Sequence, residues 1–208
     1  MVAVKVCGVT SVSDALACVK LGADAIGLNF YAGSPRCVPV DVAAAIVSAV
    51  GTAVVTVGVF VDAPYEEIAR VQASTALRCV QLHGDEPPAL LERFLPHAYK
   101  AIRMRGRASL DLVASYPGRF VLLDAYVPGA QGGTGATFDW RLAAEVARTR
   151  QVTLAGGLTP DNVAAAVAAV QPFCVDVASG VESAPGVKDP AKVAAFVAAA
   201  KGLQTSPS

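Results

Sequence analysis

Two copies of one pattern occur in residues 152–182: Val152-Thr-Leu-Ala155 followed by Gly156-Gly157, and Phe173-Cys-Val-Asp-Val177 followed by Ala178-Ser179-Gly180. Each copy has the form of a buried parallel strand that ends in a glycine turn. In the first copy, Leu158-Thr-Pro-Asp-Asn162 and an alanine-valine helix follow the turn. Glycine lets backbone N–H groups approach a ligand closely, and a helix N-terminus adds the positive end of its dipole. The two turns side by side therefore predict a phosphate-binding cup.

Outside this stretch, six earlier apolar runs alternate with helical segments. The predicted strands are residues 2–7, 25–30, 53–61, 77–82, 99–102 and 120–123. The predicted helices are residues 11–21, with Ser11 or Ser13 as N-cap, and residues 40–50, 62–73, 87–94, 109–115, 138–149 and 189–200.

Eight strands alternating with helices are compatible with a doubly wound sheet or a closed barrel. The number eight favours an α/β fold of the closed type, a single-domain parallel (β/α)8 TIM barrel. In such barrels the phosphate usually lies in the loops after strands seven and eight, which is where the repeated pattern falls. We expect residues 1–201 to form the barrel and residues 202–208 to be a frayed tail.

The composition argues against several classes of partner. The chain has 208 residues, with 17 basic and 17 acidic side chains and a net charge of zero, so no excess charge favours nucleic acid or an anionic membrane. Residues 42–61 carry no charge, but Gly51 and Thr52 interrupt them, so we interpret the run as a helix followed by a strand rather than a membrane span. The N-terminus lacks a signal-peptide pattern, which predicts a cytoplasmic protein.

Three side chains at predicted strand ends are candidates for chemistry. Cys7 ends the first strand and is either a small core residue or a general base. Asp124 follows four apolar residues and is either a cap or a partly desolvated acid able to donate a proton. Arg36 is either a solvated surface residue or a clamp for a carboxylate, which a guanidinium binds with two parallel hydrogen bonds.

The other candidates surround these three. A glycine-rich loop over residues 129–135 contains Gly132, Gly133 and Gly135, and is either a mobile lid or a third wall of the anion site. His83 is more typical of a positioning residue than of a catalytic one, and Asp176 lies within the last strand. No cluster of His, Cys, Asp and Glu has metal-binding spacing, and the five cysteines include no C-x-x-C pair, so we expect neither a metal nor a disulfide.

These residues resemble the phosphoribosylanthranilate isomerase family of tryptophan biosynthesis over nearly the whole chain. The matching motifs, in the family's order, are Lys5-Val-Cys-Gly-Val-Thr10, Ser34-Pro-Arg36, Val57-Gly-Val-Phe60, Gln81-Leu-His-Gly84, Leu123-Asp124, Gly132-Gly-Thr-Gly135 with Phe138-Asp-Trp140, Ala155-Gly-Gly-Leu158 and Asp176-Val-Ala-Ser-Gly-Val-Glu182. Each motif is weak alone, but the ordered set is highly specific. One departure is Ala136, where the family often has lysine.

The resemblance implies a ribulose-phosphate-binding barrel that isomerises N-(5-phosphoribosyl)anthranilate without a cofactor. It implies that Cys7 is the general base, Asp124 the general acid, and Arg36 the carboxylate-binding residue. It also places His83 and Asp176 at the substrate and the glycine loops, with Ser179, at the phosphate. The implied partner is a small phosphosugar, with no nucleic acid or membrane, and the enzyme is a monomer or a homodimer.

Three alternatives stay open at this stage. A sugar isomerase of the histidine pathway resembles this fold but has aspartate in place of Cys7 and a substrate with two phosphates. Indole-glycerol-phosphate synthase uses strand-end lysines, which are absent here apart from Lys5 and Lys100. The third alternative is a non-catalytic barrel that binds a phosphate ligand, which an intact pair of Cys7 and Asp124 disfavours.

Overall fold

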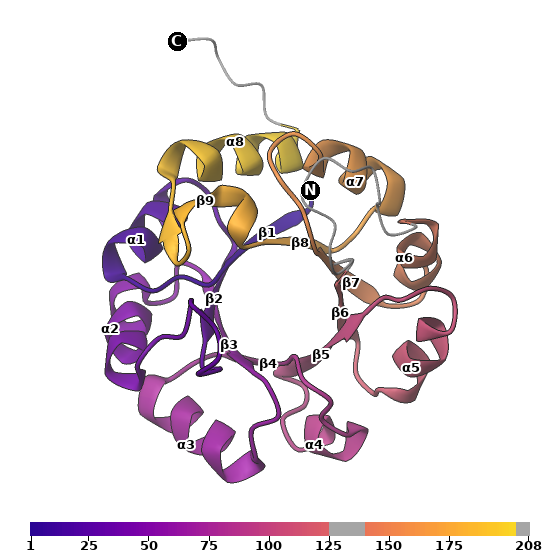
Figure 1. Cartoon of the computed structure of the whole chain (residues 1–208), viewed down its shortest axis with the longest axis horizontal. Helices are drawn as coiled ribbons and strands as arrows, with labels where there is room; N and C mark the ends of the chain where they lie inside the picture. Colours follow the sequence, from indigo (N-terminus) through magenta and orange to yellow (C-terminus); the bar gives the residue numbers. More distant parts are fainter. Residues whose placement is uncertain (125–139, 203–208) are drawn as a thin grey trace.

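The computed structural model describes residues 1–124 and 140–202, and within them eight parallel strands close into a barrel (Figure 1). Strands pair in chain order, and β8 closes the ring by pairing with β1. The strands are β1 (Ala3–Cys7), β2 (Ala25–Asn29), β3 (Val55–Phe60), β4 (Cys79–Leu82), β5 (Ala98–Arg103), β6 (Phe120–Asp124), β7 (Gln151–Ala155) and β8 (Cys174–Val177). The predicted (β/α)8 barrel is therefore confirmed.

Helices form a ring outside the strands (Figure 1). They are α1 (Val12–Lys20), α2 (Val40–Val50), α3 (Tyr65–Thr75), α4 (Pro88–Glu92), α5 (Ser109–Ser115), α6 (Trp140–Ala147), α7 (Val163–Val170) and α8 (Pro190–Lys201). Their apolar faces pack against the outward-facing strand residues, and Ile26, Leu123 and Phe196 are fully buried in this layer. The barrel thus holds its core between helices and strands, which leaves the inside of the ring available for polar groups.

Local chemistry accounts for several element boundaries. The Ser11 side chain accepts a hydrogen bond from the Asp14 amide, so Ser11 rather than Ser13 is the N-cap of α1. The uncharged run over residues 42–61 divides into α2 and β3, with Gly51 at a φ of 54° where the helix ends. Within the described residues, no helix has both the length and the apolar character needed to cross a membrane.

After β7, α7 begins at Val163, directly after residues 158–162, where the sequence predicts an alanine-valine helix. The loop before it is held by Asn162, whose side chain accepts from the Thr159 amide and donates to the Gly157 carbonyl. The chain after β8 differs from the prediction. After β8 comes only the short 3₁₀ helix η1 (Ser179–Val181). An unpredicted hairpin follows, made of β9 (Glu182–Ala184) and β10 (Val187–Lys188), which pair antiparallel. The predicted tail beyond residue 202 lies outside the described residues.

Candidate active site

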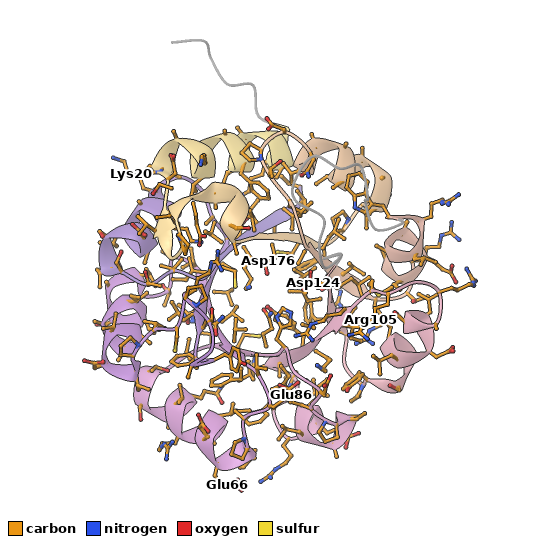
Figure 2. All side chains as sticks on the ribbon, viewed as in Figure 1. Lys20, Glu66, Glu86, Arg105, Asp124 and Asp176 are labelled. Atoms are coloured by element: carbon orange, nitrogen blue, oxygen red, sulfur yellow. The ribbon has the colours of Figure 1, made fainter. Side chains whose placement is uncertain are left out.

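A cavity of about 320 Å3 opens at the C-terminal ends of the strands. Because all eight strands are parallel, residues that end different strands meet at this one mouth. Figure 2 shows Asp124 and Asp176 inside the ring of strands. The cavity is lined by all of the described residues that the sequence singled out, namely Cys7, Arg36, His83, Asp124, Asp176, Gly156, Gly157, Ser179 and Gly180. Gly132, Gly133 and Gly135 lie outside the described residues.

Cys7 ends β1 beside a buried ion pair. Lys5 precedes it by two positions, so both side chains point into the barrel. The Lys5 Nζ lies 3.0 Å from Asp176 Oδ2, and both side chains are under 10% exposed. Burial lowers the pKa of Lys5, but the charge and hydrogen bond of Asp176, together with the charges of Cys7 and Tyr99, outweigh burial and leave that pKa well above its ordinary value. Burial raises the pKa of the Cys7 thiol, and the positive charge of Lys5 opposes that rise.

Asp124 ends β6 and takes part in a chain of side chains that crosses the barrel. The Tyr99 hydroxyl donates to Gln81 Oε1 at 2.9 Å, which directs the Gln81 amide nitrogen toward His83 Nδ1 at 2.8 Å. His83 Nδ1 must then accept, so the ring proton is on Nε2, which faces Asp124 Oδ2 at 3.4 Å. This chain of side chains directs His83 Nε2 toward Asp124.

Arg36 is held by a carboxylate of the unpredicted hairpin. Its Nε and Nη2 donate to the two oxygens of Glu182 at 2.8 and 2.6 Å, a two-point ion pair. Lys188 Nζ also donates to Glu182 Oε1 at 2.8 Å, and to the backbone carbonyls of Cys7 and Ala178. Arg36 Nη1 has no hydrogen bond to any residue that the structure describes, so it is available to a ligand in the cavity.

The turns after β7 and β8 lie against one another, as the repeated pattern predicts. Gly156 and Gly157 have φ angles of 94° and 65°, a region that favours glycine. A Cβ at Gly180 would collide with the carbonyl oxygen of Leu158, so this position needs glycine for the two turns to meet. Their backbones form one wall of the cavity, next to Ser179.

Comparison with known proteins identifies the family of this chain. The family model described as N-(5'phosphoribosyl)anthranilate (PRA) isomerase matches residues 4–199. The chain belongs to the N-(5'phosphoribosyl)anthranilate isomerase family. The family relative from Geobacter metallireducens is 49% identical over 201 residues, covering 97% of this chain and 100% of the relative.

Solved structures of the PRA isomerase family agree with this fold. The enzyme from Thermotoga maritima superposes with a TM-score of 0.89 at 40% identity, covering 97% of this chain and 100% of that one. A second structure, 39% identical with a TM-score of 0.87 and the same coverage, is a complex with reduced 1-(o-carboxyphenylamino)-1-deoxyribulose 5-phosphate. The resemblance inferred from the motifs is confirmed.

Four side chains at or beside this PRA isomerase-family site were not assigned from the sequence. They are Lys5, Gln81, Glu182 and Lys188. Lys5 could have been identified from the sequence, because a lysine inside an apolar strand is buried and must have a charged or polar partner. Lys188 gave no such signal, because it lies in a two-residue strand rather than in a long apolar run. In the described part of the chain, no group of three His, Cys, Asp or Glu side chains could hold a metal ion.

Proposed function

We propose that the protein catalyses the Amadori rearrangement of N-(5-phosphoribosyl)anthranilate to 1-(2-carboxyphenylamino)-1-deoxyribulose 5-phosphate in tryptophan biosynthesis. The observation that carries the proposal is that Cys7 and Asp124 face one cavity from β1 and β6, between a glycine wall and an arginine. Family membership and the product-analogue complex of a relative support the choice of substrate.

Asp124 acts as the general acid in this proposal. Opening the furanose ring requires a proton on the ring oxygen, and a protonated Asp124 supplies it. His83 Nε2 faces Asp124 Oδ2, so the acidic proton of Asp124 is carried by Oδ1 and His83 orients the carboxyl group. His83 is therefore proposed as a positioning and substrate-binding residue.

Cys7 acts as the general base in the next step. Ring opening leaves a protonated Schiff base, which acidifies the hydrogen on C2 of the sugar. The Cys7 sulfur takes that proton, the C2–H electrons form the C1–C2 double bond, and the iminium electrons return to nitrogen. The resulting enolamine tautomerises to the ketone. We expect no metal or organic cofactor, because the iminium is itself the electron sink.

The remaining groups bind the ends of the substrate. We propose that the backbone amides of Gly156, Gly157, Ser179 and Gly180 bind the phosphate. Arg36 Nη1 binds the anthranilate carboxylate, while Glu182 holds the rest of the guanidinium. Asp176 Oδ1 is buried without a hydrogen-bond partner among the described residues, which suits it to accept a hydrogen bond from a sugar hydroxyl.

The same proposal covers the setting of the enzyme. It acts in the cytoplasm on a small phosphosugar, with no nucleic-acid or membrane partner. A monomer and a homodimer both remain compatible with this chain, and one relative from Thermotoga maritima is described as dimeric.

The deciding assay follows the fluorescence of the anthranilate adduct after freshly made phosphoribosylanthranilate is mixed with purified protein. We expect the signal to decay at a rate proportional to enzyme concentration, with formation of the ketose product. Absence of catalysed decay, with the protein folded, would refute the proposal. Turnover of the two-phosphate aminoaldose of the histidine pathway in its place would favour the rival isomerase.

A further inference from the structure

The register of the barrel places Lys5 and Cys7 among specific neighbours. In the parallel pairing of β1 with β8, Lys5 lies opposite Asp176, and in the pairing of β1 with β2, Cys7 lies opposite Gly27. Strand residues two positions apart share a face, so Lys5 and Cys7 both project inside the ring. The lysine therefore lies directly below the cysteine on the inner face of β1, one layer below the cavity.

Gly27 is what allows the two side chains to lie together. A Cβ on Gly27 would lie 2.6 Å from the Cys7 sulfur and 3.0 Å from Lys5 Nζ. The sulfur and the ammonium thus both lie next to Gly27, on the inner face of the barrel. Any larger residue at this position would force them apart.

The charges around the sulfur explain why this contact matters. A neutral thiol cannot accept the C2 proton, and burial without a cation favours the neutral form. The charged groups that face the sulfur come from four elements: Lys5 on β1, Asp176 on β8, Lys188 on β10 and Arg36 in the loop after β2. Arg36 and Lys188 already share the carboxylate of Glu182, whereas Lys5 is fully buried and kept cationic by Asp176.

We propose that Lys5 is a positioning residue that stabilises the thiolate form of Cys7 against its burial, the form needed to remove the C2 proton. The proposal rests on the proposed isomerase function. In the step itself, the thiolate takes the C2 proton and becomes a thiol, the C2–H electron pair moves toward the cationic nitrogen, and Lys5 keeps its own protons. The thiol then gives its proton to C1 of the enolamine, as the C2 hydroxyl loses its own proton and becomes the ketone, or to solvent, and either transfer restores the thiolate. Lys5 never touches the substrate.

The test measures the pH dependence of Cys7 alkylation by iodoacetamide, with each cysteine peptide quantified by mass spectrometry. The midpoint of the profile reports the thiolate fraction, and the plateau at high pH reports access to the sulfur. Cys37 is exposed and provides a reference thiol within the same molecule. In Lys5→Met we expect the midpoint to rise by about one unit or more, which slows Cys7 alkylation at neutral pH roughly tenfold per unit.

Two further variants make the test decisive. Gly27→Ala keeps every charge but separates the sulfur from the ammonium, and we expect it to raise the same midpoint, even if Lys5→Met fails to fold. Lys100→Met is the matched control, because Lys100 is a barrel lysine of similar burial whose partner is Glu86 at 3.0 Å. We expect Lys100→Met to lose stability without moving the Cys7 midpoint.

The outcomes separate this inference from the isomerase assignment. A raised midpoint in Gly27→Ala, and in Lys5→Met where it folds, together with a lower kcat and a shifted acidic limb of the pH–kcat profile, supports the role of Lys5. An unchanged midpoint in the folded variants overturns it, even if activity falls, because a merely structural role would lower activity alone. Failure of the proposed function would instead appear in the wild-type protein, as a missing isomerase activity with the alkylation shifts still present.

Discussion

Replacing Glu182 with glutamine is expected to weaken substrate binding through Arg36 while leaving the chemical step at Cys7 nearly unchanged. The Glu182 carboxylate accepts two hydrogen bonds from Arg36 and one from Lys188, and its side chain is 5% exposed. In Glu182→Gln an amide oxygen at the Oε1 position can still accept from Arg36 Nε and Lys188 Nζ. The amide nitrogen, however, is a donor that faces donors, so the two-point contact with Arg36 is lost.

The cost to stability follows from the burial of this network. Removing one partner of a buried ion pair typically costs about 3–5 kcal/mol of unfolding free energy, because the remaining charge is left uncompensated. This penalty applies to Lys188, because its side chain is only 2% exposed and the variant removes the negative charge that it pairs with. For a chain of this length, we expect the melting temperature to fall by roughly 6–20 °C.

The effect on binding has a separate origin. Without Glu182, the Arg36 side chain regains rotamer freedom worth about 1.5–2 kcal/mol, which substrate binding must then offset. We expect KM to rise about 10- to 30-fold with kcat changed little, because the lost interaction acts on substrate and transition state alike. Steady-state fluorescence kinetics and thermal unfolding measure the two effects.

The pH dependence gives a further check on the same variant. Burial raises the pKa of Glu182, but hydrogen bonds from Arg36 and Lys188 outweigh it and leave that pKa below its ordinary value. A carboxylate with a lowered folded pKa stabilises the protein above its unfolded pKa of about 4.3 and loses that contribution as the pH falls through the folded value. The stability difference between wild type and variant should therefore be full at neutral pH and shrink below about pH 4.

Glu145→Gln serves as the matched control. Its partner Arg107 is 75% exposed and Glu145 is 45% exposed, so this surface pair contributes about 0–1 kcal/mol. We expect its melting temperature and KM to match wild type. A KM for Glu182→Gln within about twofold of wild type, despite the expected loss of stability, would refute the reasoning that Glu182 positions Arg36.

The remaining predictions concern the proposed chemistry and binding groups. Cys7→Ala and Asp124→Ala should each lower turnover by roughly 10²–10⁴-fold in the same assay, and wild-type turnover in either folded variant would contradict the acid–base roles. Arg36→Met should mainly raise KM for the carboxylated substrate, so an unchanged KM would count against the clamp. Gly180→Ala should weaken inhibition by inorganic phosphate and raise KM, because the added Cβ collides with the Leu158 carbonyl and pushes the two turns apart. Phosphate inhibition equal to that of wild type in the folded variant would contradict the proposed phosphate site.

The fold was predictable because its strands are continuous apolar runs punctuated by glycine and proline. Residues 40–50 and 109–115 were predicted with the observed helix bounds, since proline or glycine lies close to the ends of both segments in the sequence. The loop before α7 was predicted as a segment, but the hydrogen bonds of the Asn162 side chain to Gly157 and Thr159 were not, because they depend on the three-dimensional course of the loop. The hairpin of β9 and β10 was missed because three-residue and two-residue strands carry no detectable period.

The site was predictable only as separate positions. Strand ends identified Cys7 and Asp124, because a parallel barrel brings such ends to one mouth. The partner of Arg36 was not predictable from spacing, since Glu182 lies 146 residues away in the chain. The same limit applies to the pairing of Lys5 with Asp176, which depends on closure of the barrel between its first and last strands.

The hairpin that carries Glu182 and Lys188 has a consequence for redesigning substrate preference. Lys188 Nζ donates at 2.6 Å to the backbone carbonyl of Cys7, while Glu182 holds Arg36. One small insertion after β8 therefore braces both the base and the group proposed to recognise the aromatic acid. Attempts to retarget the enzyme to another aryl or alkyl amine by rebuilding the whole hairpin, Lys188 included, should disturb catalysis along with selectivity. Altering the rim near Ser34, which bonds the Arg36 amide and Asn29, offers a route that leaves the shared brace intact.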